Sequence, residues 1–170
     1  MEALLSGVQR LGLDLGEEQI ALFQRYFQEL VEWNRRTNLT AITDYREVQT
    51  KHFLDSLTVS LVIPRDVTAN GTLMDVGSGA GFPGLPLKIL WPGLRVTLVE
   101  SVGKKAAFLR HLAGALGLEG VEVRTQRAES LGHDPQVRDT FDVVVSRAVA
   151  DLSVLAELTL PFCKLGGRVV

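Results

Sequence analysis

The segment from Asp75 to Gly84, which reads Asp-Val-Gly-Ser-Gly-Ala-Gly-Phe-Pro-Gly, constrains the fold more than any other part of the chain. It overlaps the end of a short apolar run, residues 72–76, that has the length and character of a buried strand. Glycines after the first strand of an α/β sheet let a ligand approach the backbone closely. The pattern therefore predicts a parallel sheet with a binding loop after its first strand.

From about residue 68, short apolar runs alternate with helix-like stretches. This alternation is typical of a parallel sheet with helices on both faces, so we predict a Rossmann-like α/β fold. Because the chain stops at Val170 inside a predicted strand, we expect the C-terminal strands of this sheet to be missing. We expect strands at 72–76, 95–100, 121–125 and 141–146 and from residue 168, and helices at 85–91, 104–116 and 151–162, with Ser101 as a candidate cap of the helix at 104–116.

Residues 1–67 read as an N-terminal helical extension, and residues 68–170 as the ligand-binding domain. The first two helices are indicated by apolar residues at helical spacing, with Tyr26 at the border of the second apolar stripe. A third helix is predicted to begin at Asp44, with Glu47 completing a capping box, and to end at Pro64. Its buried side is predicted to hold Val48, Phe53, Leu57 and Leu61.

The composition excludes several classes of protein. The 170 residues are 46% hydrophobic and 22% charged, as in ordinary globular domains, and no run of about 18 apolar residues predicts a membrane span. No secretory signal is visible at the start, and the single Cys163 excludes an intrachain disulfide, so we expect a cytoplasmic protein. A net charge of −2 argues mildly against nucleic-acid binding.

Two cofactor classes compete for the glycine-rich loop. A dinucleotide needs G-x-G-x-x-G, which the string from Gly79 to Gly84 matches, but the strand leads into Gly77 instead. S-adenosylmethionine (SAM) sites have an acidic residue at the end of the strand and then G-x-G-x-G, as Asp75 and the loop from Gly77 to Gly81 supply. SAM carries a sulfonium and an amino group and no phosphate, so a nearby carboxylate favours it.

Glu100 ends the second predicted strand, where its carboxylate could accept hydrogen bonds from both ribose hydroxyls of either cofactor. Each of these features also has a purely structural explanation: a tight loop, a helix cap for Asp75, or a solvated strand end for Glu100. Their combination in this order predicts a nucleoside-cofactor site.

The residues after the fourth strand narrow the kinds of methyl transfer that the chain could catalyse. Methylation of an exocyclic amine often uses an Asn-Pro-Pro-aromatic motif there, and this chain has Ser146, Arg147 and Ala148 instead. Methylation of a pyrimidine carbon needs a cysteine nucleophile, and Cys163 fits a small buried hydrophobe better. A ring nitrogen such as guanine N7 has a free lone pair, so orientation alone could drive the transfer.

Several motifs together resemble the RsmG (GidB) family, the bacterial small-subunit rRNA guanine-N7 methyltransferases. The resemblance extends from about Leu22 to the last residue and is most specific where the loop continues into Phe82-Pro83-Gly84. The matching segments are Trp33–Thr40, Lys51–Leu57, Asp75–Gly84, Val99–Leu109, Arg127–Glu129 and Ser146–Ala148.

The resemblance implies methyl transfer from SAM to N7 of guanine 527 in 16S rRNA, on a seven-stranded sheet, with the 30S subunit as partner. It also implies a monomer and no metal. The implied cofactor-binding residues are Asp75, Gly77, Ser78, Gly79, Gly81, Phe82, Glu100, Ala128, Glu129 and Arg147. The alternatives are a SAM-dependent methyltransferase with a non-RNA substrate and a non-catalytic SAM- or nucleotide-binding module.

Lys51, His52, Asp55 and Ser56 fall at helical spacings of three and four, hence on one polar face. This face is either solvated, with a Lys51–Asp55 pair, or a wall of the substrate pocket. The expected catalytic residues are Arg147, His52 and Asp55, although N7 needs no general base. The expected substrate residues are Asn38, Lys51, Ser56 and Arg36, and the cations available for RNA are Arg35, Arg36, Lys51, Lys104, Lys105, Arg124, Arg127 and Arg147.

Overall fold

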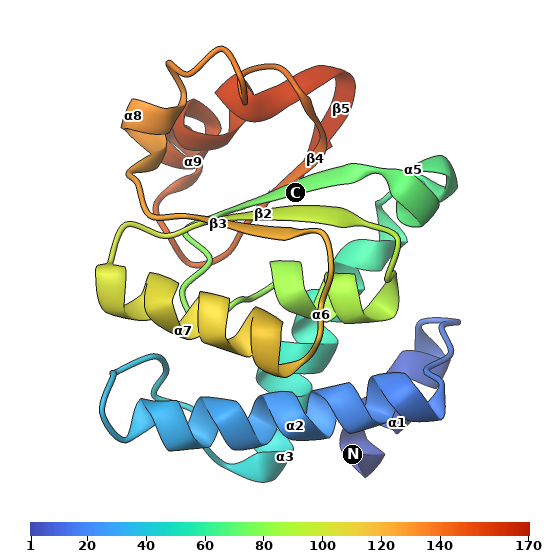
Figure 1. Cartoon of the computed structure of the whole chain (residues 1–170). Coiled ribbons are helices and arrows are strands. Elements are labelled where there is room, and N and C mark those ends of the chain that lie inside the picture. Colours follow the sequence, from blue (N-terminus) through green and yellow to red (C-terminus); the bar gives the residue numbers. More distant parts are fainter.

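A computed structural model describes all 170 residues and shows one parallel sheet with helices on both faces (Figure 1). This confirms the predicted α/β fold. The strands pair in the order β3-β2-β1-β4-β5, every pair parallel. Their bounds are β1 (Thr72–Val76), β2 (Arg95–Val99), β3 (Val121–Arg124), β4 (Phe141–Ser146) and β5 (Cys163–Val169).

The strand order reverses between β1 and β4, which pair in register from Leu73–Val143 to Val76–Ser146. Ligands of open α/β sheets bind at such a switch point, in the crevice beyond the carboxyl ends of the strands. The loops that follow β1 and β4 therefore meet at one place, and this is where the glycine-rich loop lies.

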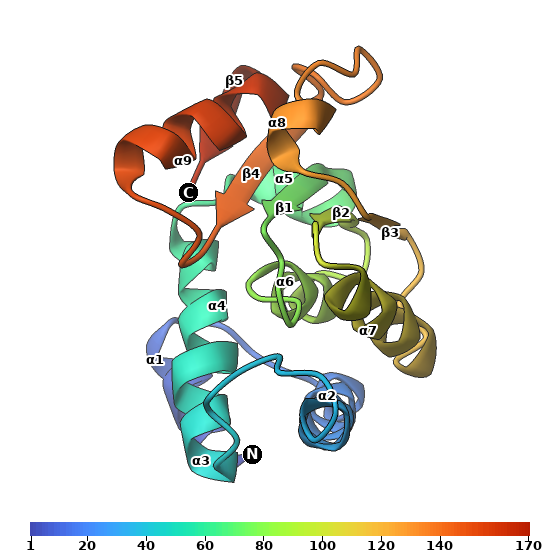
Figure 2. The same cartoon turned by 90° about the vertical axis from the view of Figure 1, so that its left-hand side faces the viewer.

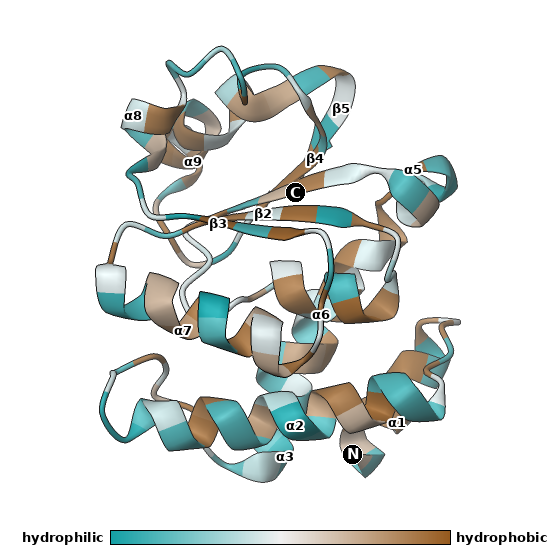
Figure 3. Cartoon of the chain, viewed as in Figure 1, coloured by the Kyte–Doolittle hydropathy of each residue, from teal (hydrophilic) through white to brown (hydrophobic).

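Two helical layers cover the sheet. One face carries α6 (Gly84–Leu90) and α7 (Gly103–Ala115), and the other carries α8 (Ala128–Leu131), α9 (Leu152–Thr159) and the short η3 (Leu160–Phe162) (Figure 2). All seven residues of α6 are buried, because the N-terminal helices pack against its outer side. In Figure 3 the central strands are largely apolar, whereas the helices carry alternating apolar and polar patches.

The N-terminal helices share the core of the sheet domain. A single cluster of 27 buried residues joins Phe23 and Phe53 to Leu73 and Phe108. The packing is therefore continuous across residue 67, and the predicted domain boundary there stays a prediction. The elements are α1 (Glu2–Arg10), α2 (Glu17–Asn34), α3 (Tyr45–Val48), η1 (Gln49–Leu54), α4 (Asp55–Thr58), η2 (Val59–Leu61) and α5 (Arg65–Asn70).

The third predicted helix is capped by Asp44 as expected, but Glu47 pairs with Lys51 instead of completing the capping box, and the segment does not stay an α-helix. The Asp44 side chain accepts from the backbone N–H groups of Arg46 and Glu47, at 3.0 and 2.9 Å. From Gln49 to Leu54 the helix widens into a π-helix. A π turn inserts an extra residue and changes which later residues face inward. The predicted core residues Val48, Phe53 and Leu57 are all buried, whereas Leu61, in the 3-10 turn η2, is 65% exposed.

Three smaller expectations are also corrected. Tyr26, placed at the border of its stripe, is fully buried, because α6 and the glycine-rich loop cover that side of α2. Ser101 does not cap α7, whose N-cap is Val102 without a side-chain bond. β5 begins at Cys163 rather than at Arg168, with an irregular register opposite β4. None of the helices combines the length and apolar character that crossing a membrane requires.

Candidate functional site

The glycine-rich loop is tied to the end of β2. The N–H groups of Gly77 and Ser78 both donate to the carbonyl of Val99, at 2.9 and 3.0 Å. Gly77 has a φ of 74°, and a Cβ there would lie 2.4 Å from the side chain of Val149 in the loop after β4. Glycine is required here on both grounds, since the backbone is left-handed and the space is filled.

Glu100 is fixed by this loop. One carboxylate oxygen accepts from Gly79 N–H at 2.9 Å, and the other accepts from Val102 N–H at 2.8 Å. The side chain is only 5% exposed. Each carboxylate oxygen has a further lone pair, so an immobilised acceptor pair is available to two neighbouring hydroxyls of a ligand.

Asp75 is fully buried under the loop and turned toward α6. Its Oδ2 accepts from the first N–H of that helix, Gly84, at 2.9 Å, while its Oδ1 has no hydrogen-bond partner. Burial raises the pKa of Asp75 to about 7, and the bond from Gly84 and the charge of Arg147 oppose the rise only in part.

The Asp75–Gly84 bond separates the two cofactor classes. A dinucleotide places its pyrophosphate at the N-terminus of the helix after the glycine-rich loop. Here a carboxylate of the protein already occupies that N-terminus, and Glu100 adds a second carboxylate near the same loop. Because Asp75 occupies the helix N-terminus and Glu100 adds a negative charge, a phosphate is disfavoured and a ligand with cationic and hydroxyl groups, which SAM has, is favoured.

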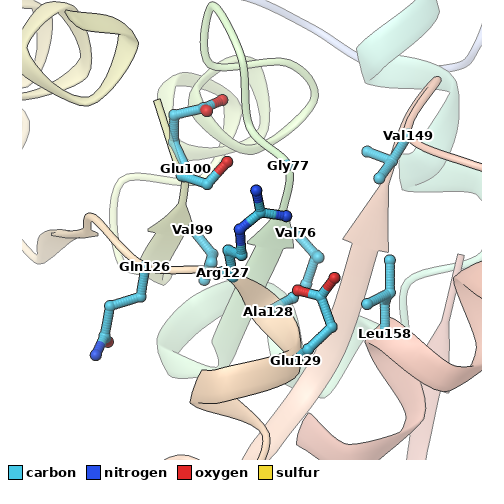
Figure 4. A pocket seen from close by; sticks show the side chains of 11 residues that line it. Val76, Gly77, Val99, Glu100, Gln126, Arg127, Ala128, Glu129, Val149 and Leu158 are labelled. Carbon is cyan, nitrogen blue, oxygen red and sulfur yellow. The ribbon is translucent and has the colours of Figure 1, made fainter. Parts of the chain in front are cut away.

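A cavity of about 190 Å³ opens beyond the ends of β1, β2 and β3 (Figure 4). It brings together four of the predicted cofactor residues, Gly77, Glu100, Ala128 and Glu129. Figure 4 shows Glu100 on one side of it and the segment from Arg127 to Glu129 on another. The apolar members of its lining are Val76, Val99, Ala128, Val149 and Leu158.

A second cavity, of about 320 Å³, shares Gly77, Glu100 and Val149 with the first. It extends toward the N-terminal helices and the residues after β4. The other residues that line it are Leu39, Thr40, His52, Ser78, Gly79, Ala80, Phe82, Lys105, Arg147 and Ala148. The two cavities together form one candidate site. The first is the end where the predicted nucleoside-binding residues gather, and the second is the more polar end.

Arg147 lies where the second cavity meets the helix that begins at Asp44. Its guanidinium donates to Asp55 Oδ2 at 2.8 Å and to the Lys51 carbonyl at 3.2 Å, and it lies 5.1 Å from the centre of the Phe82 ring. The expected catalytic residues Arg147, His52 and Asp55 are thus brought together. Ala148, the next residue, has a left-handed φ of 55°, a conformation concentrated at functional sites.

His52 has a poor geometry for a general base. Burial, and next the charge of Arg147, lower its pKa to about 4. Its Nδ1 is 3.1 Å from a guanidinium nitrogen of Arg147, and its Nε2 is 2.9 Å from the Thr40 hydroxyl. Both ring nitrogens are therefore engaged by the protein, and the imidazole has little affinity for a proton from a substrate.

An aromatic stack connects the N-terminal helices to the glycine-rich loop. The Phe82 ring lies between Tyr26, at 5.3 Å and 8°, and His52, at 4.5 Å and 16°. The Tyr26 hydroxyl donates to the carbonyl of Ala80 at 2.7 Å, and a Cβ on Gly81 would come within 2.6 Å of it. This role of Tyr26 was not predicted, because helical periodicity indicates which side chains are buried but not which group a buried hydroxyl bonds to.

Several expected residues lie outside both cavities. Lys51 pairs with Glu47 rather than with Asp55, because the π turn rotates it outward and Arg147 takes Asp55. Ser56 is 1% exposed and donates to the His52 carbonyl, so the predicted polar face divides into buried residues, His52 and Ser56, and exposed ones, Lys51 and Asp55. Asp75 lies beneath the loop, Gly81 lies within it against Tyr26 and Leu85, and neither residue lines a cavity.

The expected substrate residues Asn38 and Arg36 are exposed, and Arg36 lies over the Trp33 ring. The cavity wall is built instead by Leu39 and Thr40. Asn34 shapes that wall: its side chain accepts from the N–H groups of both residues and donates to the Thr40 carbonyl, at 2.8 to 3.0 Å. The sequence signal that could have identified Asn34 was its place in the Trp33–Thr40 motif.

The chain matches a family model described as rRNA small subunit methyltransferase G (GidB) over residues 19–170. It is 54% identical over its full length to the ribosomal RNA small subunit methyltransferase G of Dehalococcoides mccartyi and 56% identical to that of a Roseiflexus species. It spans 71% of the length of each.

The chain belongs to this family. Solved structures confirm the fold of this chain at low sequence identity. A Methanococcus maripaludis protein assigned to the SAM-dependent methyltransferases matches 84% of this chain and 60% of its own length, with a TM-score of 0.59 and 14% identity. A SAM complex of an MtNAS mutant matches 88% of this chain and 55% of its own, with a TM-score of 0.56 and 20% identity.

The Tyr26→Phe substitution tests the support of the glycine-rich loop. It removes only the hydroxyl and leaves the buried Ala80 carbonyl without a donor, so we expect the protein to lose about 1–2 kcal/mol of stability. Amide hydrogen exchange should accelerate in residues 77–83. Tyr45→Phe is the matched control, since that hydroxyl donates to Gln24 at an exposed position. Equal effects of the two variants would contradict the role of Tyr26.

The pKa of Asp75 predicts a pH dependence of stability. Between pH 3.8 and about 7, the unfolded chain ionises this group while the folded chain holds the proton, so folding becomes less favourable as pH rises. Relative to Asp75→Asn, the wild type should lose on the order of 2–3 kcal/mol of unfolding free energy between pH 5 and pH 8.

Urea unfolding of both proteins at the two pH values measures this difference. Asp14→Asn, at an exposed position, is the control and should give a difference that is independent of pH. A pH-independent difference for Asp75→Asn as well would show that burial does not hold the Asp75 proton.

Proposed function

We propose that this protein transfers a methyl group from SAM to N7 of a guanine in 16S rRNA of the small ribosomal subunit, guanine 527 by its family resemblance. The observation that carries the proposal is the pair of buried carboxylates at one glycine-rich loop. Asp75 closes the helix N-terminus that a pyrophosphate would need, and Glu100 offers two acceptors to a ribose. Membership in the methyltransferase G family supports the same reaction.

The residues present fit SAM along both cavities. Glu100 would hold the ribose hydroxyls, and Val99, Ala128 and Glu129 would surround the adenine in the first cavity. Gly77 and Gly79 would border the methionine end in the second. Asp75 would act on the cation through its charge and not by contact, because it lines neither cavity. When bound, SAM supplies an electrophilic methyl group.

The side chains at the polar end favour a nucleophile that needs no deprotonation. His52, which lines the second cavity, has a lowered pKa and both nitrogens engaged. Guanine N7 already carries a free lone pair. The protein's contribution is then to orient the base against the methyl group and to exclude water, which can supply much of the rate acceleration.

The RNA would approach from the side of the second cavity. Lys105 lines that cavity and Arg127 lines the first, so both are placed to meet phosphates near the target. Arg35 and Arg124 are paired with acidic side chains and are less available. With a net charge of −2, recognition would rest on the shape of the 30S particle and a base turned out of its stack. In this proposal the protein acts in the cytoplasm as a monomer.

Glu100→Ala tests the ribose site. The variant loses both acceptors and releases Gly79 from the loop, so we expect the dissociation constant for SAM to rise at least about tenfold, as the loss of a charged hydrogen bond would cause. Isothermal titration calorimetry measures it. Glu119→Ala, at an exposed position, should bind SAM like the wild type, and unchanged affinity in Glu100→Ala would remove the first cavity as the SAM site.

Radiolabelled SAM and 30S particles from cells that lack the enzyme test the reaction itself. We expect label in 16S rRNA at a single N7-methylguanine, located by mapping the modified base. Label in another molecule and none in RNA would favour a different methyl acceptor. Binding of SAM with no transfer to any particle would favour a non-catalytic module.

A further inference from the structure

Some N–H groups of the Arg147 guanidinium are hydrogen-bonded to the protein, and the others have no partner there. One terminal nitrogen, Nη1, donates to the Lys51 carbonyl and to Asp55, at 3.2 and 2.8 Å. The other, Nη2, is 3.1 Å from His52 Nδ1. These three bonds leave the Nε–H and one Nη2–H, and Arg147 also lines the second cavity. The helix that contains His52 therefore determines how the guanidinium is aimed.

The hydrogen-bond partners of His52 fix its tautomer. A guanidinium has donors only, so Nδ1 must carry a lone pair toward Arg147. In the neutral ring, the proton is then on Nε2 and is donated to the hydroxyl oxygen of Thr40 at 2.9 Å. That oxygen also accepts from Ile42 N–H at 3.1 Å. The neutral Nε2–H form satisfies all of these contacts at once.

Protonation would undo the arrangement. A proton on Nδ1 would replace the acceptor by a donor that faces the donors of Arg147, and two cations would then lie 3.1 Å apart. Asp55, the acidic side chain that acts on His52, is already bonded to the guanidinium. The ring orientation is fixed in addition by the Phe82 stack, at 4.5 Å and 16°.

We propose that His52 is a positioning residue: its Nδ1 lone pair aims Arg147 at an oxygen acceptor of the ligands in the second cavity, while its Nε2–H holds the Thr40 wall. The inference rests on the proposed methyltransferase function. The acceptor is either the carboxylate of the methionine end of SAM or the carbonyl oxygen of the target guanine. His52 moves no proton in the reaction and acts only through Arg147.

Two amide substitutions separate the two nitrogens of the ring. His52→Asn places an amide oxygen near the position of Nδ1 and can still accept from Arg147, whereas His52→Gln places its amide near Nε2 and cannot. We expect His52→Asn, which loses the Thr40 contact but keeps the acceptor for Arg147, to retain at least about tenfold more kcat/KM for 30S methylation than His52→Gln, which loses that charge-assisted bond. Both variants should unfold at similar urea concentrations.

A double-mutant cycle with Arg147→Ala tests whether His52 acts through that residue. His52→Gln should add no further loss in the Arg147→Ala background, because the group that it positions is gone. The affinity for SAM distinguishes the two acceptors. A loss of SAM binding in His52→Gln indicates the methionine carboxylate, and a loss confined to transfer indicates the guanine oxygen.

Equal loss in the Asn and Gln variants, or additive losses in the cycle, would overturn the proposal. If the wild-type rate falls as one group is protonated, and this pH dependence disappears in His52→Asn, His52 would instead be a general base.

¹⁵N NMR of labelled histidine supplies a readout that needs no activity. The Nε2–H tautomer of His52 should persist from pH 6 to 9, and an Nδ1–H form or an imidazolium in that range would overturn the positioning role. A wild type that shows this tautomer but methylates no RNA would contradict the proposed function instead.

Discussion

The hydrogen bond between the buried Asp75 carboxylate and the Gly84 N–H is the contact on which the site depends. It bends the chain back from the end of β1 to the start of α6, so that the intervening glycines form a loop against β2. The bond does not fully offset the cost of burying the carboxylate, as the raised pKa of Asp75 shows. A fold that only needed to cap α6 could do so with a neutral side chain, so the acidic group is best explained by the cation of a ligand above the loop.

The N-terminal helices are part of the site and not an attachment to it. Tyr26 from α2 and His52 from η1 lie on opposite faces of Phe82, which belongs to the glycine-rich loop. His52 also joins Thr40 to Arg147, so both walls of the second cavity are fixed by one ring. Within the π-helical segment His52 faces the cavity while the neighbouring Lys51 is exposed to solvent.

The sequence predicted what local pattern can encode. Strand positions follow from short apolar runs, and the glycine spacing with Glu100 pointed to residues that line both cavities. It did not reveal which partners long-range packing would supply. The Lys51–Asp55 pair, one of the two alternatives for that face, is not formed because Arg147, which is distant in the sequence, pairs with Asp55. Leu61 was wrongly predicted to be buried because the helix tightens there into a 3-10 turn. Tyr26 was missed because helical periodicity distinguishes buried from exposed faces but does not name the carbonyl that a buried hydroxyl will find.

The polar groups around the second cavity are mostly bonded to one another, and this bears on the chemistry. Arg147 is bonded to Asp55 and His52, and His52 to Thr40, so these side chains hold a shape more than they offer a base. Such a network rigidifies a site because each member is satisfied only in one arrangement. A reaction that required proton removal would need one of these groups to leave its partner at the moment of transfer. Attack by a ring nitrogen requires no such rearrangement, and a rigid cavity that aligns the lone pair with the methyl group then suffices.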